Sequence, residues 1–163
     1  MSWWRNAPAY TLLYAVEVPA SGGDTHFGSL VRLYDELDDD SREKWKGLMV
    51  RHRNPSPYFR DLPHNERAHL HPLLQRHPEI NRQLVFASPG YAKEVKGCSP
   101  EESEDILQRL ATSLETPDFV QKWQAGDLLV WDNRAVVHRA TRYNETLTRH
   151  MWRISIRAKS QTA

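Results

Sequence analysis

The segment GDLLVWDNRAVVHRA, residues 126–140, decides how the rest of this sequence is interpreted. It contains two runs of strand-forming residues, LLVW and AVVH, separated by polar residues. We therefore predict strands over 128–131 and 136–140. The second strand carries a single histidine, His138, among valines. That histidine is either a packed core residue or one ligand of a metal whose other ligands must be found elsewhere.

Further strands are predicted on both sides of this segment. YTLLYAVEVP (10–19) is rich in strand formers and ends at a proline, and QLVFAS (83–88) has the same character. In RHMWRISIRA (149–158), side chains that alternate between faces put a tryptophan and two isoleucines on one side. The other side carries Arg149 and Arg153, with roughly 13 Å between their Cα atoms in a regular strand.

Two helices and a long loop complete the predicted organisation. Apolar residues recur at helical spacing from Ser29, and DELDDDS (35–41) ends that helix. SPEESEDILQRLATSL (99–114) has a serine N-cap, a proline at the first position and a glutamate that completes a capping box. HRNPSPYFRDLPHNER (52–67) is a long loop of a kind that often covers a site. Antiparallel strands with two outer helices predict one domain over residues 1–163, a sandwich or jelly roll.

Composition excludes several classes of function. The chain of 163 residues has a net charge of +1, and its 22 basic residues are scattered, so no nucleic-acid partner is expected. Cys98 is the only cysteine, which excludes an intrachain disulfide and a thiolate metal cluster. No apolar run reaches membrane-spanning length. We expect a cytoplasmic protein without a membrane partner.

The chain contains eight histidines, which are candidate metal ligands. His69 and His71 would share one face of a strand, but they lie in a polar, loop-like region, which favours a solvated or structural role. The remaining histidines, apart from His138, have no partner at a telling spacing. His138 itself would more often be a core histidine, and arginines in a final strand are usually solvated or paired. The local sequence alone therefore favours no metal site.

The order of several motifs changes this interpretation. LLYAVEVPASGGDTHF (12–27), HPLLQRHPEINRQLVFAS (71–88), VKGCSPEESEDILQRL (95–110), WQAGDLLVWDNRAVVHRA (123–140) and RHMWRISI (149–156) together resemble the TauD/TfdA family. Members of that family are oxygenases that use Fe(II), 2-oxoglutarate and O2, and they form succinate and carbon dioxide. The resemblance implies a mostly β fold with flanking helices, the double-stranded β-helix or jelly roll. It also implies a small-molecule substrate.

The resemblance assigns a role to each of five residues. His138 matches the distal histidine of the two-His-one-carboxylate metal triad. Arg149 matches the arginine that pairs with the distal carboxylate of 2-oxoglutarate, and Thr25 the threonine that helps to hold it. Trp131 matches an aromatic wall of the pocket. Arg153 matches a second arginine, which in taurine enzymes meets the acidic head group, so an anionic substrate is expected.

The chain departs from the family pattern at its start. The other two metal ligands of the family form an H-x-D motif, whose aspartate would fall immediately before Met1 at the usual spacing. We therefore expect the fold to be incomplete at the N-terminus, and its exposed sheet edge makes a homo-oligomer possible. Three readings follow: an oxygenase cut short by a misassigned start or a gene fragment, a non-catalytic carboxylate-binding or interaction module, or a metal site rebuilt from residues such as Asp24, His26 and His69.

Overall fold

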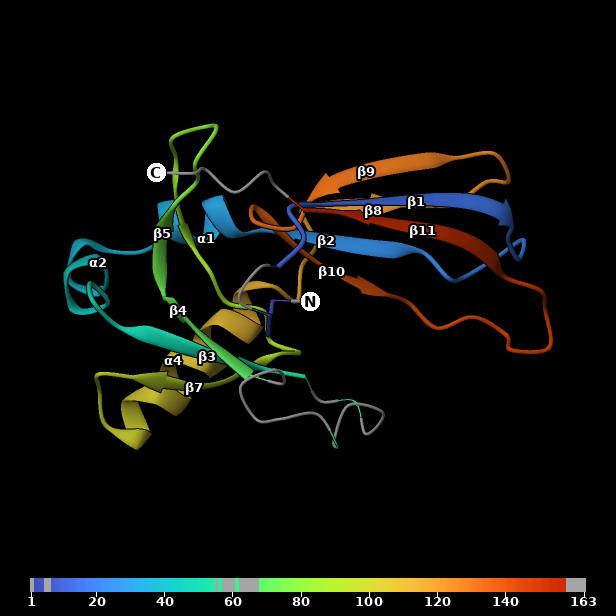
Figure 1. The fold of residues 1–163 in the computed structure, drawn as a ribbon. Helices are drawn as coiled ribbons and strands as arrows, with labels where there is room; N and C mark the ends of the chain where they lie inside the picture. Colours follow the sequence, from blue (N-terminus) through green and yellow to red (C-terminus); the bar gives the residue numbers. More distant parts are fainter. Residues whose placement is uncertain (1, 5–6, 55, 57–60, 62–67, 158–163) are drawn as a thin grey trace. The chain divides into compact units, whose positions relative to one another are not determined.

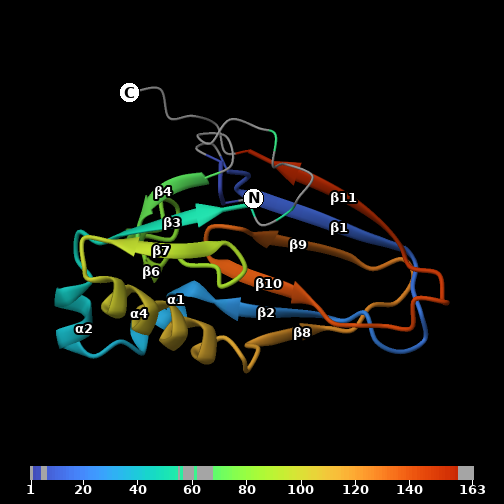
Figure 2. The ribbon, with the colours of Figure 1, turned by 90° about the horizontal axis from the view of Figure 1, so that it is seen from below.

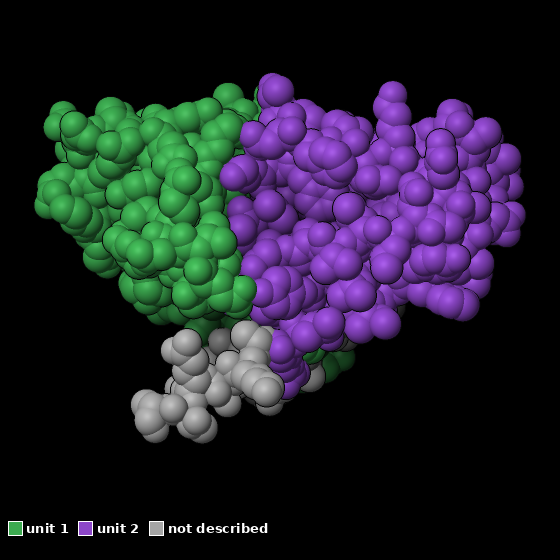
Figure 3. Space-filling model, turned by 90° about the horizontal axis from the view of Figure 1, so that it is seen from above, with its two compact units in different colours: residues 1–7, 30–115 green, residues 8–29, 116–163 purple. Residues whose placement is uncertain are grey.

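The structure, a computed structural model, describes residues 2–4, 7–54, 56, 61 and 68–157. The chain forms two compact units, which Figure 3 colours separately. The mixed unit consists of residues 1–7 and 30–115, and the β unit consists of residues 8–29 and 116–163. Most of the long loop predicted over 52–67 lies outside the described residues. The prediction of a single domain over the whole chain stays a prediction.

The β unit is built from two three-stranded antiparallel sheets, in the orders β11-β1-β9 and β10-β2-β8 (Figures 1 and 2). Its strands are β1 (Tyr10–Glu17), β2 (Thr25–Ser29), β8 (Phe119–Gln121), β9 (Leu128–Asp132), β10 (Val136–Ala140) and β11 (His150–Ile156). Phe27 of β2 contacts Trp131 of β9 with ring centroids 5.3 Å apart, so these side chains mark the inner faces of the two sheets. Trp131 lies in a strand that the sequence predicted, whereas β2, which carries Phe27, was not predicted as a strand.

The mixed unit combines a sheet in the order β4-β3-β7, a hairpin of β5 and β6, and helices. Its elements are α1 (Leu30–Asp35), α2 (Asp39–Lys44), β3 (Met49–Arg53), β4 (Ala68–Pro72), β5 (Leu74–Arg76), β6 (Gln83–Val85), β7 (Ala92–Lys96) and α4 (Pro100–Ser113). Helix α4 packs against β7 and buries Ile106 and Leu110. None of the helices in the described part of the chain is long and apolar enough to cross a membrane.

The structure confirms the four strands predicted in the β unit, with boundaries within one or two residues. It also confirms the capping box of α4, in which Ser99 and Glu102 bond each other's backbone. Two local predictions were wrong. The segment 35–41 ends the first helix and also begins a second one, which was not predicted. Asp38 caps this second helix, since its side chain accepts a hydrogen bond from the Ser41 amide at 2.6 Å. Arg149 immediately precedes β11 instead of lying inside it.

The prediction that His69 and His71 lie in a loop-like region was also wrong. His69 and His71 lie in β4, on one face of the strand, with their ring centroids 4.7 Å apart. His52 of β3 pairs directly with His69 in the sheet register. Three imidazoles therefore share one face of this sheet. The sequence pattern concealed this because a proline ends the strand and polar residues precede it.

Candidate functional site

All five residues assigned by the family resemblance belong to the β unit. His138 pairs with Phe27 across β10 and β2, and Thr25 is two residues before Phe27. Side chains two residues apart share a face, so His138 and Thr25 both belong to the inner face that Phe27 marks. Arg153 pairs with Leu13, two residues after Thr11, which itself pairs with Trp131. Register thus places Arg153 and Trp131 on the inner face of the opposing sheet.

The indole of Trp131 is held in a fixed orientation by a hydrogen-bond network. Its Nε1 donates to Oδ1 of Asn133 at 3.0 Å, and Nδ2 of Asn133 donates to Oγ1 of Thr11 at 2.9 Å and to the Pro8 carbonyl at 3.3 Å. Trp131 and Thr11 are both buried. Sequence reasoning missed Asn133, although a polar amide directly after a strand is a signal for such a role.

The imidazole of His138 lies beside this fixed indole. Its ring centroid is 4.8 Å from that of Trp131, with 62° between the planes, and 5.8 Å from that of Phe27. The β10 strand brings the histidine to this position because its register aligns residue 138 with residue 27. The two aromatic rings restrict how the imidazole can turn, while one side of it remains exposed to solvent.

The surroundings of His138 favour its neutral form. Desolvation by the neighbouring protein, followed by the positive charge of Arg153, lowers the pKa of His138 from 6.5 to about 4. Water at the exposed side of the ring reduces the desolvation, but both causes act in the same direction. At neutral pH the ring therefore has a free nitrogen lone pair, which is what a metal ligand or a proton acceptor requires.

Arg149 is positioned by the glycine turn that precedes β2. Its Nη2 donates to the Gly23 carbonyl at 3.3 Å, and its guanidinium lies over the Tyr143 ring at 5.8 Å from the centroid. Gly23 has φ of 72°, and a Cβ there would come within 3.1 Å of Arg149 Nε. The glycine is therefore needed both for its backbone conformation and for this close approach. Among the described residues no carboxylate pairs with Arg149.

Thr25 follows the same turn by two residues. The threonine is 3% exposed, and its Oγ1 accepts a hydrogen bond from Trp123 Nε1 at 3.0 Å. Because the hydroxyl accepts in that contact, its proton stays available to a bound acceptor. The sequence analysis did not single out Trp123. The only indication in the sequence was that this tryptophan stands alone before the Gly126 turn. The turn therefore combines a hydroxyl donor with a guanidinium, the groups that suit a carboxylate.

The described residues offer fewer ligands for a metal ion than for a carboxylate. The described residues contain no group of three His, Cys, Asp or Glu side chains that could hold one. His138 is thus a single candidate ligand, and the residues described do not by themselves fit an Fe(II) site. The same finding gives no support to a site rebuilt from Asp24, His26 and His69.

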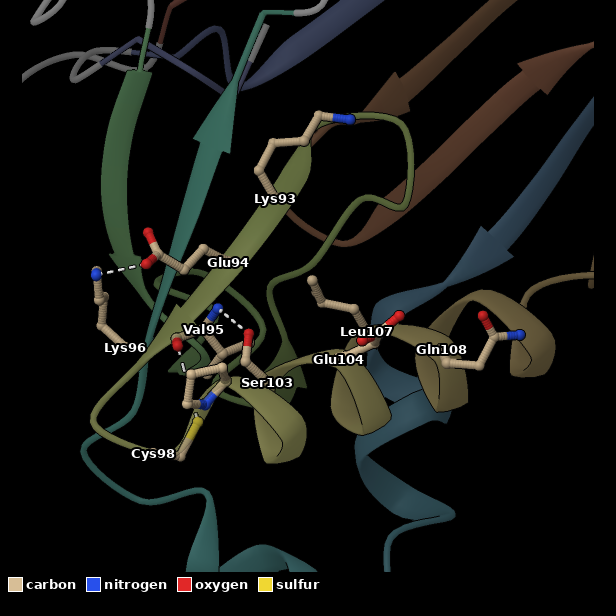
Figure 4. A pocket seen from close by; sticks show the side chains of 10 residues that line it. Lys93, Glu94, Val95, Lys96, Cys98, Ser103, Glu104, Leu107 and Gln108 are labelled. Atoms are coloured by element: carbon tan, nitrogen blue, oxygen red, sulfur yellow. Dashed lines mark hydrogen bonds and ion pairs between the residues drawn. The ribbon is translucent and has the colours of Figure 1, made fainter.

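A separate hollow of about 580 Å³ lies in the mixed unit, between β7 and α4 (Figure 4). Its wall includes the ion pair of Glu94 with Lys96 and the hydrogen bond from the Val95 amide to Ser103 Oγ, 2.8 Å long. These groups satisfy one another within the wall. None of the five residues assigned by the resemblance lines this hollow.

The β unit thus combines, among the described residues, an arginine without a carboxylate partner and a threonine at one turn with a histidine against an aromatic wall. The chain belongs to the family described as taurine catabolism dioxygenase TauD, TfdA, whose model matches residues 1–155. The predicted family and its mostly β, jelly-roll fold are confirmed.

Similar proteins of known name agree with this assignment. The alpha-ketoglutarate-dependent 2,4-dichlorophenoxyacetate dioxygenase of Burkholderia sp. (strain RASC) is 32% identical over 162 residues, 93% of this chain and 54% of that protein. The alpha-ketoglutarate-dependent sulfonate dioxygenase of Saccharomyces cerevisiae is 28% identical over 98% of this chain and 41% of its own length. The chain therefore spans about half the length of these relatives.

Solved structures give the same result at the level of the fold. The crystal structure of AAD-2 in complex with Mn(II) and N-oxalylglycine matches with a TM-score of 0.82 and 26% identity, over 98% of this chain and 67% of that one. A putative alpha-ketoglutarate-dependent taurine dioxygenase from Burkholderia xenovorans matches with a TM-score of 0.81 and 33% identity, over 93% of this chain and 53% of that one.

Proposed function

We propose that this protein is an Fe(II)- and 2-oxoglutarate-dependent oxygenase that acts on a small anionic substrate, with O2 as the oxidant. The observation that carries the proposal is the unpaired guanidinium of Arg149, held at Gly23 two residues before the buried hydroxyl of Thr25. The relatives named above are dependent on alpha-ketoglutarate, the same compound as 2-oxoglutarate. The cytoplasm is the location we infer for such an enzyme.

Arg149 and Thr25 bind the distal carboxylate of 2-oxoglutarate in this proposal. A planar guanidinium can donate two parallel hydrogen bonds to a carboxylate, which gives both charge neutralisation and a defined direction. The contact to the Gly23 carbonyl uses only Nη2, so other donors of the guanidinium are available. The face of Tyr143 restricts the arginine to this side and reduces the entropy lost when the ligand binds.

His138 is the candidate metal ligand from this chain, with Trp131 as the wall beside it. The lowered pKa keeps the imidazole neutral at physiological pH, so no proton has to leave before a metal binds. An Fe(II) site of the two-His-one-carboxylate type needs two further ligands. We infer that these come from an H-x-D segment outside the described residues.

Arg153 is the candidate contact for the substrate. It is exposed on the inner side of β11, and its charge acts on His138. Among the described residues it has no carboxylate partner. An unpaired arginine next to the reacting centre favours an anionic group. The names of the relatives, a sulfonate dioxygenase and a phenoxyacetate dioxygenase, agree with that charge.

A second function is favoured by one specific observation. Because no metal-binding group of three side chains exists among the described residues, the 163-residue chain could bind a carboxylate without turning it over. In that case the protein is a carboxylate-binding module derived from the same fold. The two functions share the Arg149 site and differ in whether succinate is formed.

Succinate formation from 2-oxoglutarate in the presence of Fe(II), ascorbate and O2 separates them. We expect no turnover by the 163-residue chain and turnover when an H-x-D segment is placed before Met1. In that longer chain, His138→Ala should abolish the activity, because it removes one of three ligands. His26→Ala is the matched control and should leave activity unchanged. Failure of the longer chain to turn over, with 2-oxoglutarate binding intact, would favour the binding module.

A further inference from the structure

A buried hydrogen bond joins the candidate carboxylate site, which consists of Thr25 and Arg149, to the turn that precedes β9. Trp123 Nε1 donates to Thr25 Oγ1 at 3.0 Å, and the two side chains are 8% and 3% exposed. The hydroxyl makes no other hydrogen bond among the described residues. Trp123 is therefore the protein group that influences most strongly which way this hydroxyl points.

The two partners of this hydrogen bond differ in what they can do. An indole nitrogen only donates, whereas a threonine hydroxyl can donate once and accept twice. The contact thus makes Thr25 the acceptor on the side of Trp123, and the hydroxyl proton points elsewhere. At a buried position a proton without an acceptor costs free energy, so the hydroxyl favours a ligand that accepts it. Without the indole N–H, the same hydroxyl could turn and accept from the ligand instead.

Trp123 is itself held by a closed turn, residues 121–127. The Asp127 carboxylate accepts from Gln121 Nε2 at 3.0 Å and from the Gln124 amide at 2.9 Å. Gln121 also pairs directly with Thr25 in the register of β8 and β2. The segment that carries the indole is thus tied to the strand that carries the hydroxyl. Because the donor is already fixed, no binding free energy is spent on orienting it.

Arg149 adds donors on the other side of the same ligand group. Its Nη2 donates to the Gly23 carbonyl, and a guanidinium has further N–H donors and no acceptor. A group held by Arg149 and Thr25 therefore meets donors from both side chains. An ionised carboxylate accepts from both with its two oxygens. A carboxamide has one oxygen, and its NH2 group is left facing a donor.

We propose that Trp123 is a positioning residue that sets the specificity of this site. By holding the Thr25 hydroxyl as a donor toward the ligand, it makes the site select a carboxylate over a carboxamide of the same shape. This inference rests on the proposed function, in which Arg149 and Thr25 bind the distal carboxylate of 2-oxoglutarate. The charge of Arg149 contributes to the same selectivity independently, so Trp123 accounts for a part of it.

Calorimetric titration of the 163-residue chain with N-oxalylglycine, and with N-oxalylglycinamide by displacement, tests the proposal. The two ligands share the oxalyl end and differ only in the distal carboxylate or carboxamide. Trp123→Phe keeps an aromatic ring and removes the N–H donor. The ratio of the two Kd values, amide over acid, should fall about 10-fold, because the freed hydroxyl can also accept. A tryptophan that only supported the fold would change both Kd values in parallel.

Trp152→Phe is the matched control. Trp152 is 60% exposed in β11 and belongs to no candidate site, so the same substitution there should leave the ratio unchanged.

A double-mutant cycle shows whether Trp123 acts through Thr25. Thr25→Val removes the hydroxyl and keeps its shape, so it should lower the ratio by a similar factor. Adding Trp123→Phe to Thr25→Val should then change the ratio no further, because the two side chains act as one unit. Thr25→Val also covers the case in which Trp123→Phe does not fold, as judged by circular dichroism.

Two results would overturn the inference, and they are distinguishable. If the parent binds N-oxalylglycine but a folded Trp123→Phe or Thr25→Val variant keeps the parent ratio, Trp123 does not set the specificity and the carboxylate site stands. If the parent binds neither ligand, the proposed carboxylate site fails, and this inference fails with it.

Discussion

The two units of the molecule differ in how completely they bury their apolar side chains. The mixed unit holds nearly all of the large side chains that are almost fully buried: Leu30, Val50, His52, Leu73, Leu84, Val85 and Val95. Among the residues that the structure describes, the β unit holds eight of the nine exposed large hydrophobic side chains, and Ile80 is the one in the mixed unit. Deep burial of large side chains is thus concentrated in one unit, and the candidate functional residues are in the other.

Because of this difference, the β unit exposes side chains that a ligand or another polypeptide segment could cover, and the described part of the mixed unit exposes few. The inner faces of the β unit carry the neutral His138, the fixed Trp131 and Arg153, and its outer face carries Trp152. Ligand binding between the sheets would stabilise the folded unit by mass action. The mixed unit resembles an ordinary closed core in its described part.

The largest expected effect contrasts one leucine from each unit. Leu84 in β6 is 2% exposed and Leu128 in β9 is 59% exposed. Leu84→Ala should lower the free energy of unfolding by about 3 kcal/mol, since it removes buried methyl groups and leaves a cavity. Leu128→Ala should change it by less than about 0.5 kcal/mol at concentrations where the chain is monomeric. Urea denaturation followed by circular dichroism measures both, and equal effects would contradict the contrast.

The second prediction concerns pH and the histidine cluster of the mixed unit. His52 is 1% exposed and stacked on Phe86, and neither of its ring nitrogens has a hydrogen-bond partner in the described structure. Burial, with the nearby His71, lowers the pKa of His52 from 6.5 to about 3. The unfolded chain therefore binds the proton more readily than the folded chain. Stability is complete above about pH 6.5 and decreases as the pH falls toward 3.

His52→Phe is the variant that isolates this effect. It keeps an aromatic ring on Phe86 and removes the group that must stay neutral. At pH 5 we expect the variant to be more stable than the parent by about 2 kcal/mol, with a smaller difference at pH 7.5. Burial also lowers the pKa of His71, so some pH dependence should remain. Parallel denaturation curves for parent and variant at the two pH values measure it. An unchanged pH dependence would mean that His52 is not the group involved.

The smallest expected effect compares two glycines with similar backbone angles. Gly23 has φ of 72° and lies against Arg149, whereas Gly47 has φ of 77° and nothing within 4 Å of its missing Cβ. Gly23→Ala and Gly47→Ala should each cost about 1 kcal/mol in backbone strain. Only Gly23→Ala displaces the guanidinium, so only this variant should weaken 2-oxoglutarate binding, by about 10-fold. Equal binding by both variants would show that the turn does not position Arg149.

The strongest local patterns in the sequence predicted the fold well in the β unit and less well in the mixed unit. Strands β1, β9, β10 and β11 were predictable because apolar runs or a clear alternation of apolar and polar residues specify them. Strands β3 and β4 were not, because histidines and arginines interrupt their alternation and their pairing depends on distant segments. Helix α2 was missed because its acidic first turn was interpreted as the end of the preceding helix.

The candidate site shows the same limit. Residue types and family resemblance identified His138 and Arg149 from the sequence. The contact between Arg149 and Gly23 spans 126 positions, and the one between Trp123 and Thr25 spans 98, so no local pattern could predict either. The sequence and the family resemblance therefore predicted which residues carry the chemistry, and those roles stay predictions. It did not indicate which neighbours orient them.

Binding of 2-oxoglutarate measured by isothermal titration calorimetry tests the central claim most directly, with Arg149→Ala as the variant and Arg157→Ala as the control. N-oxalylglycine serves as a second ligand that cannot be turned over. Loss of the guanidinium should raise the Kd about 30-fold, equivalent to about 2 kcal/mol, because a partly desolvated carboxylate is left without its cation. Arg157→Ala should bind like the parent. Equal affinity of parent and Arg149→Ala would contradict the account and remove the carboxylate site on which the proposed function rests.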